Sequence, residues 1–213
     1  MNGRQIPNLI TLSRLLLAGV AFWFFERMLH QGGTPEHAQA AAWAFWLYAV
    51  AASTDVLDGF LARRYHWVTA LGRVADPVVD KLLTLGALVY LAADSSNLAL
   101  PGDSGPVMPV WAVVLVLARE FLVTTLRGLV ENRGLAFPAD RFGKAKMALQ
   151  TAYVLILVGA AGGIAAALGL PFLTWLRTPP VIAVLFWSMI AMTVFSGANY
   201  SLRAARMLAG ESK

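Results

Sequence analysis

The sequence contains no cysteine and few charged residues. Of its 213 residues, 14% are charged and 58% are hydrophobic. The lack of cysteine excludes disulfide bonds, thiolate catalysis and cysteine-ligated metal sites. Soluble domains have a larger fraction of charged residues and a smaller fraction of hydrophobic ones. Together with the long apolar runs, this composition predicts a membrane protein. The length suits one compact bundle of membrane helices, so we expect a single domain over residues 1–213.

The basic residues also lack the arrangement that nucleic-acid binding requires. The net charge is +5, but the lysines and arginines gather at the ends of apolar segments instead of forming a stripe. This distribution is typical of membrane proteins. We therefore expect contact with membrane lipids and no nucleic-acid partner. The first apolar run contains Arg14 and precedes no small-residue cleavage pattern, so it is predicted to be a retained helix.

Six segments are long and apolar enough to cross a bilayer, which takes about 20 residues per helix. They cover residues 6–27, 38–64, 68–93, 108–131, 144–168 and 180–208. The sequence thus predicts an all-α fold with six transmembrane helices and both termini on one side. That side and its loops hold most of the basic residues, whereas the other side holds Arg27 and Arg177. The positive-inside rule then places both termini in the cytoplasm.

Four aspartates stand at the predicted cytoplasmic ends of the second and third segments. Asp55 and Asp58 are three residues apart, and Asp76 and Asp80 are four apart, so each pair shares one face of a helix. A short turn between the segments lets those faces meet. Four converging carboxylates repel one another unless cations bind, and oxygen ligands at this density suit Mg²⁺ or Mn²⁺. Such a set can hold two ions, an arrangement used in phosphoryl transfer.

The alternative is a structural role, in which the aspartates form ion pairs with basic neighbours. Those neighbours are Arg63, Arg64, Arg73 and Lys81. Carboxylates inside membrane segments are costly and mostly functional, which favours the metal site. Gly59 and Gly72 flank the aspartates, and a residue without a side chain lets a bulky ligand approach the backbone. Close helix packing explains either glycine equally well.

The pattern of this stretch resembles a known family signature. It reads Asp55-x2-Asp58-Gly59-x2-Ala62-Arg63-x8-Gly72-x3-Asp76-x3-Asp80. All eight residues match the signature of the CDP-alcohol phosphotransferases in type and spacing. The resemblance implies a six-helix enzyme of the cell (inner) membrane, a homodimer, with its active site facing the cytoplasm. Members of this family displace CMP from a CDP-linked lipid or alcohol with a second alcohol.

The resemblance also implies roles for individual residues. Two Mg²⁺ or Mn²⁺ ions are held by Asp55, Asp58, Asp76 and Asp80. Asp80 is also the residue expected to accept the proton of the attacking hydroxyl. The CDP-lipid is expected to contact Asn8, Thr11, Gly59, Arg63, Thr69 and Gly72.

Segments outside the signature resemble one branch of the family. Residues 6–14 (IPNLITLSR) and 76–84 (DPVVDKLLT) are similar to phosphatidylglycerophosphate synthases and to CDP-type cardiolipin synthases. Residues 119–127 (REFLVTTLR) and 143–150 (GKAKMALQ) resemble the first group, although Met147 stands where it usually has threonine. This resemblance implies CDP-diacylglycerol and glycerol 3-phosphate as substrates, and phosphatidylglycerophosphate and CMP as products.

Glycerol 3-phosphate is a small dianion, so its pocket needs cations. The candidates on the cytoplasmic side are Arg119, Lys144, Lys146, Arg127 and Arg203. Arg119 stands out because it lies within a predicted span beside Glu120. Membrane anchoring and headgroup contact are the alternative for Arg127 and Lys144.

Three other functions stay open. One is a cardiolipin synthase that uses phosphatidylglycerol as the acceptor. A second is another CDP-alcohol phosphotransferase, such as a phosphatidylinositol-phosphate synthase. The third is a transporter in which the aspartates form an ion pathway, but the sequence shows neither repeated halves nor paired discontinuous helices.

We expect turnover to depend fully on Mg²⁺ or Mn²⁺. Excess chelator should abolish CMP release from CDP-diacylglycerol, and Asp55→Asn or Asp76→Asn should weaken metal binding in calorimetry, because each removes one carboxylate charge. Glu36→Gln, at the other end of the second segment, is the control and should leave metal affinity unchanged. Full activity in excess chelator would contradict the two-metal site.

Overall fold

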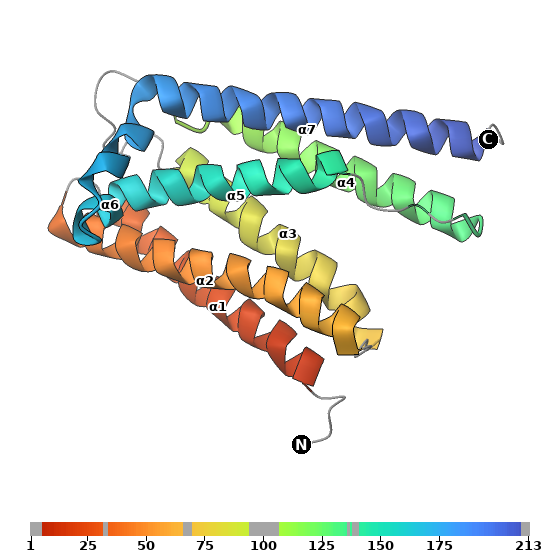
Figure 1. The fold of residues 1–213 in the computed structure, drawn as a ribbon, viewed down its shortest axis with the longest axis horizontal. Coiled ribbons are helices and arrows are strands. Elements are labelled where there is room, and N and C mark those ends of the chain that lie inside the picture. The colour runs from red at the N-terminus through yellow and green to blue at the C-terminus, as the bar shows by residue number, and fades with distance from the viewer. Residues whose placement is uncertain are drawn as a thin grey trace.

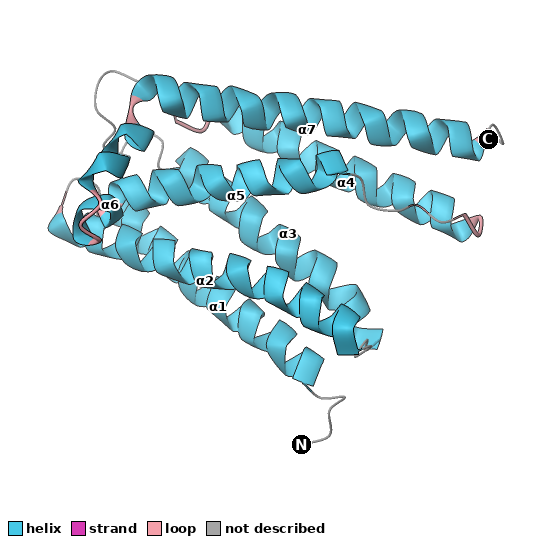
Figure 2. Ribbon diagram, viewed as in Figure 1, coloured by secondary structure: helices cyan, strands magenta, loops and turns pink. Residues whose placement is uncertain are grey.

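The computed structural model describes residues 6–31, 34–65, 70–93, 107–135, 137 and 141–209. Within its helices, the side chains of residues 6–11, 55–65, 70–77, 79 and 80 lie outside the description. The described residues form helices and short connections and contain no strand (Figure 2). The prediction of an all-α fold is therefore confirmed for this part of the chain.

Each predicted apolar segment corresponds to one long helix. These are α1 (Ile6–His30), α2 (Pro35–Tyr65), α3 (Ala70–Ala93), α4 (Val110–Asn132), α5 (Arg141–Ala161) and α7 (Pro179–Leu208). The short α6 (Ile164–Ala167) and the 3₁₀ helix η1 (Pro171–Arg177) connect α5 to α7. Proline opens both α2 and α7, where its missing amide hydrogen removes no intrahelical bond.

The fifth helix ends earlier than the sequence predicts, because two glycines stop it. Residues 144–168 read as one apolar segment, but α5 ends at Ala161 and Gly163 has a φ of 63°. This left-handed conformation suits glycine and breaks the helix. A Cβ atom on Gly162 would lie 2.7 Å from the backbone nitrogen of Ala42. The end of α5 therefore approaches α2 too closely for any side chain at this position.

The long helices form two groups. α1 packs on α2 and α3, while α7 packs on α4 and α5. Contacts of α2 with α5 and of α3 with α4 join the groups. The groups diverge toward the end of the molecule where α1 begins and α7 ends, and they converge at the end that holds α6 (Figure 1). The start of α1 and the end of α7 therefore lie at the same end.

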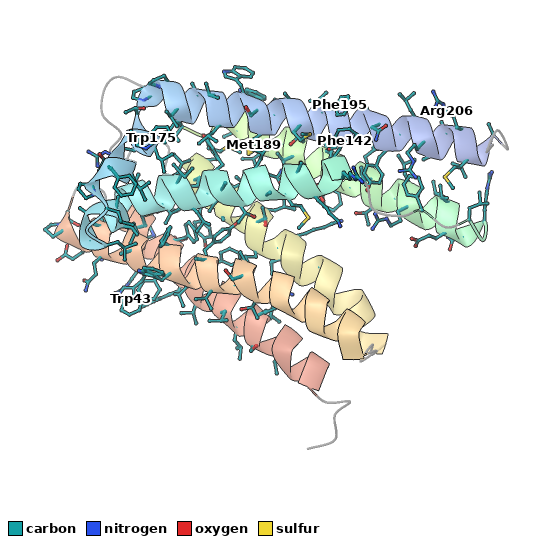
Figure 3. The ribbon with its side chains drawn as sticks, in the orientation of Figure 1. Trp43, Phe142, Trp175, Met189, Phe195 and Arg206 are labelled. Atoms are coloured by element: carbon teal, nitrogen blue, oxygen red, sulfur yellow. The ribbon has the colours of Figure 1, made fainter. Side chains whose placement is uncertain are left out.

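The outer surface of the helices is unusually apolar. Every tryptophan in the described residues is exposed, namely Trp23, Trp43, Trp46, Trp111, Trp175 and Trp187. Trp43 and Trp175 lie toward the α6 end, and Arg206 lies at the opposite end (Figure 3). Exposed apolar surface of this extent marks contact with a membrane or a partner. By length and composition, one helix within the described residues, α7, clearly suffices to span a membrane.

Candidate active site

A pocket of about 570 Å³ lies among α3, α4, α5 and α7. This volume is in the usual range for small-molecule sites. Its charged lining residues are Lys81, Arg119, Arg127, Lys144, Lys146, Glu120 and Glu131. Five are basic and two are acidic, so the described part of the lining carries a formal excess of three positive charges. Such a pocket attracts anions.

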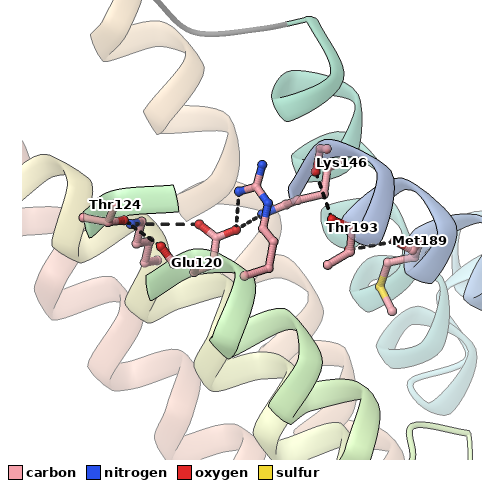
Figure 4. Close-up of polar contacts among 8 residues, drawn as sticks. Glu120, Thr124, Lys146, Met189 and Thr193 are labelled. Atoms are coloured by element: carbon pink, nitrogen blue, oxygen red, sulfur yellow. Dashed lines mark hydrogen bonds and ion pairs between the residues drawn. The ribbon is translucent and has the colours of Figure 1, made fainter. Parts of the chain in front are cut away.

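Glu120 is the centre of the charged cluster. Its Oε1 accepts hydrogen bonds from Arg119 Nη1 at 2.8 Å and from Lys146 Nζ. Lys81 Nζ lies 3.9 Å from Oε2 of the same carboxylate. Figure 4 shows Glu120 between Lys146 on one side and Thr124 on the other. One buried carboxylate therefore holds cations from α3, α4 and α5 close together.

Helix α7 closes the pocket against Arg119. A Cβ atom on Gly197 would lie 3.1 Å from Arg119 Cγ, so glycine gives the arginine stem room to pass. The guanidinium lies 5.6 Å from the centre of the Tyr200 ring, a distance that permits a cation–π interaction. These contacts hold the guanidinium beside Glu120 and at the wall of the pocket.

Several buried hydrogen-bond donors in the lining have no partner among the described side chains. Arg119 Nε, Arg127 Nε and Gln150 Nε2 are shielded from solvent and bond to no described residue. All three residues line the pocket. Buried donors are nearly always satisfied, so donors left free around one cavity indicate a ligand rich in acceptor atoms. A phosphate with hydroxyl groups meets this requirement.

The aspartates adjoin the pocket through α3. Asp55 and Asp58 belong to α2, and Asp76 and Asp80 to α3, two helices in mutual contact. Their side chains lie outside the described residues, and the described side chains contain no group of three or more potential metal ligands. Thr84 lines the pocket and stands four residues after Asp80, on the same face of α3. Four carboxylates on two adjoining helices are a donor set that fits Mg²⁺ or Mn²⁺.

The predicted acceptor residues divide into three kinds. Arg119, Arg127 and Lys144 line the pocket, and Lys144 is exposed at its edge. Lys146 lines it too, but it is 3% exposed and bonded to Glu120. Arg203 is not among the lining residues, and its guanidinium lies 5.5 Å from the centre of the Phe137 ring.

The residues predicted to bind the CDP-lipid lie on α1, α2 and α3. Asn8 and Thr11 belong to α1, Gly59 and Arg63 to α2, and Gly72 to α3. Their side chains, and Thr69 altogether, lie outside the described residues. The contacts predicted for them stay predictions.

Some of the lining residues were not expected from the sequence. The sequence marks Glu120 only as a neighbour of Arg119, and it marks Lys81 only as a possible ion-pair partner of the aspartates. Gln150 stands four residues after Lys146, so helical spacing alone could have placed both on one face. For Gly197 and Tyr200, no signal in the sequence connects α7 with Arg119.

Comparison with known proteins decides the family. The model of the CDP-alcohol phosphatidyltransferase family matches residues 4–195. The chain belongs to this family. The match contains α1 to α5 and more than half of α7, so the aspartates and every residue of the pocket lining except Tyr200 lie within it.

Relatives of this phosphatidyltransferase carry two kinds of name. A probable phosphatidylglycerophosphate synthase of Mycobacterium tuberculosis is 35% identical over 97% of this chain and 84% of its own. A CDP-diacylglycerol–glycerol-3-phosphate 3-phosphatidyltransferase of Bacillus subtilis is 31% identical over 92% of this chain and 93% of its own. A CMP-forming cardiolipin synthase of Streptomyces coelicolor is 30% identical over 95% of this chain and 84% of its own.

We expect Glu120→Gln to lower the stability of this phosphatidyltransferase. The change leaves Lys146 and Arg119 without their carboxylate, and breaking a buried ion pair costs about 3–5 kcal/mol. Thermal unfolding in detergent should show a lower midpoint, and adding Lys146→Met should recover part of it. Glu131→Gln, an exposed glutamate of the same helix, is the control. Equal midpoints for Glu120→Gln and Glu131→Gln would contradict the central role of Glu120.

Proposed function

We propose that this enzyme transfers the phosphatidyl group of CDP-diacylglycerol to glycerol 3-phosphate. The products are phosphatidylglycerophosphate and CMP. The observation that carries the proposal is the cationic pocket lined by α3, α4, α5 and α7. One of these helices, α3, also bears Asp76 and Asp80. The Mycobacterium tuberculosis and Bacillus subtilis relatives, whose names describe this activity, support it.

The charge of the pocket favours a phosphate-bearing acceptor. The phosphate of glycerol 3-phosphate carries nearly two negative charges, and the lining has a formal excess of three positive ones. Arg119 and Arg127 each have a buried Nε donor that no described residue satisfies, and a guanidinium fork suits phosphate oxygens. Lys144 adds an exposed ammonium at the pocket edge. Lys146 contributes positive potential while holding Glu120, and Arg203 extends the basic surface along α7.

The donor lipid belongs on α1, α2 and α3 in this proposal. Asn8, Thr11, Gly59, Arg63, Thr69 and Gly72 would contact the cytidine nucleotide, as in the family. Asp55, Asp58, Asp76 and Asp80 would hold two divalent ions, which neutralise the pyrophosphate when bound. Asp80 would accept the proton of the reacting hydroxyl of glycerol 3-phosphate while the oxygen of that hydroxyl forms a bond to the β-phosphorus. The bond between that phosphorus and the oxygen retained by CMP breaks in the same displacement.

A six-span topology gives this chemistry its place in the cell. The long helices correspond to the predicted spans, and the start of α1 and the end of α7 lie toward the same end of the molecule, where the two groups of helices diverge (Figure 1). Exposed tryptophans on several helices suit contact with lipid. We propose one domain over residues 1–213, inserted in the cell (inner) membrane with cytoplasmic termini and active site, working as a homodimer.

Cardiolipin synthesis is the second candidate, and the Streptomyces coelicolor relative favours it. Its acceptor, phosphatidylglycerol, carries one negative charge and two acyl chains. The excess of positive charge in the pocket matches a small dianion better.

An acceptor assay tests the proposal directly. Purified protein in detergent should release CMP from CDP-diacylglycerol and Mg²⁺ when glycerol 3-phosphate is added. Phosphatidylglycerol and inositol phosphate, offered separately, should give little CMP. Turnover with phosphatidylglycerol but none with glycerol 3-phosphate would replace the proposal with cardiolipin synthesis.

Substitutions in the pocket should act on the acceptor and spare the donor. Arg119→Ala and Lys144→Ala should each raise KM for glycerol 3-phosphate roughly 10- to 100-fold, because each removes a charge-assisted contact. KM for CDP-diacylglycerol should hardly change. Arg206→Ala is the matched control, since this exposed arginine of α7 lies outside the lining. An unchanged KM in Arg119→Ala would show that the phosphate binds elsewhere.

A further inference from the structure

Gln150 is a buried amide whose hydrogen-bond donor has no partner in the described part of the chain. The residue is 1% exposed, and its Nε2 bonds to no residue that the structure describes. Its side chain borders the same pocket as the charged cluster. Leaving a buried donor unpaired destabilises a fold, and a leucine or methionine could fill the same volume without that cost. The amide therefore points to a ligand in the pocket.

The position of Gln150 separates it from the charged part of the pocket. Gln150 lies one turn of α5 beyond Lys146, about 5–6 Å further from the start of that helix. The other neutral polar residues of the described lining are Thr84, Thr124 and Tyr200. The lining thus has a cationic part, around Arg119, Arg127 and Lys144, and a neutral polar part, in which the amide of Gln150 is buried with a donor that no described residue satisfies.

The two parts match the two kinds of group on a polyol phosphate. Glycerol 3-phosphate has a phosphate at one end, a hydroxyl on the middle carbon, and a terminal hydroxyl that reacts. A hydroxyl both donates and accepts hydrogen bonds, and so does a neutral amide. A second cation at position 150 would bind phosphate oxygens instead and would not recognise a hydroxyl.

We infer that Gln150 binds the non-reacting hydroxyl of the acceptor and thereby determines specificity. The acceptor class is a short polyol phosphate with a hydroxyl next to the reacting carbon. This inference rests on the proposed function, because it assigns a partner within the acceptor pocket. A site built to bind a hydroxyl rejects an analogue that lacks it, since its own polar group is then left unpaired.

The test compares two acceptors on two enzymes. Glycerol 3-phosphate and 3-hydroxypropyl phosphate differ only in the middle hydroxyl. The unmodified enzyme should prefer glycerol 3-phosphate by about tenfold in kcat/KM, the effect of one buried hydrogen bond. In Gln150→Met, which keeps the volume and removes the amide, the preference should fall to about one. KM for CDP-diacylglycerol should not change.

The ratio of the two kcat/KM values does not depend on how much of a preparation is folded. If Gln150→Met gives no turnover, the same ratio of kcat/KM values is measured for Gln150→Asn, whose side chain is one methylene shorter and holds the amide further from the pocket. Thr193→Val is the matched control, because Thr193 is fully buried, donates to Met189 O at 2.7 Å and lies outside the lining. It should keep the full preference.

Each outcome decides one point. A preference retained in the Gln150 variants rejects the role of Gln150 and leaves the proposed function intact. A KM raised equally for both acceptors shows that the amide contacts the phosphate, which also rejects the inference. No transfer to either phosphate, with turnover of phosphatidylglycerol, rejects the proposed function and this role with it.

Discussion

The bonds between Glu120 and its cations are the constraint on which the acceptor pocket depends. Lys81, Arg119 and Lys146 come from three different helices, and without a carboxylate among them they would repel one another. Lys146 is buried, so its charge requires a partner at close range. Glu120 supplies this partner and thereby links α4 to α5 through their side chains.

The same carboxylate decides which donors are left for a substrate. Glu120 bonds to Lys146 and to one nitrogen of Arg119, so in the proposed reaction the acceptor phosphate would contact Arg119 Nε, Arg127 and Lys144. These groups surround an excess of positive charge that one carboxylate does not cancel. A monoanion leaves more of that excess uncompensated than a dianion does. In the proposed function, the pocket would therefore favour a dianionic acceptor, because Glu120 neutralises only part of the positive charge of the lining.

Local sequence features allowed the helices to be predicted, and long-range contacts explain what was missed. Apolar runs marked every long helix. The metal site inferred from the aspartate spacing stays a prediction, because those side chains lie outside the described residues. The predicted end of α5 was wrong because Gly162 and Gly163 look like part of the apolar run in the sequence. In the structure, Gly163 has a positive φ, and Gly162 lies against the backbone of Ala42 in α2. Glu120 and Lys146 are 26 residues apart, so only the fold shows that they are partners.

Helix α3 joins the two halves of the proposed chemistry. Asp76 and Asp80 occupy successive turns of this helix, and Thr84, in the next turn, lines the acceptor pocket. Lys81 follows Asp80 directly and its Nζ lies 3.9 Å from Glu120 Oε2, so the helix that carries the proposed metal ligands is also linked to the charged cluster of the pocket. A rigid helix holds such groups at constant separations of about one turn. In the proposed reaction, α3 would therefore help to set the distance between the donor's phosphorus and the acceptor's hydroxyl, together with the cations that α4 and α5 contribute to the pocket.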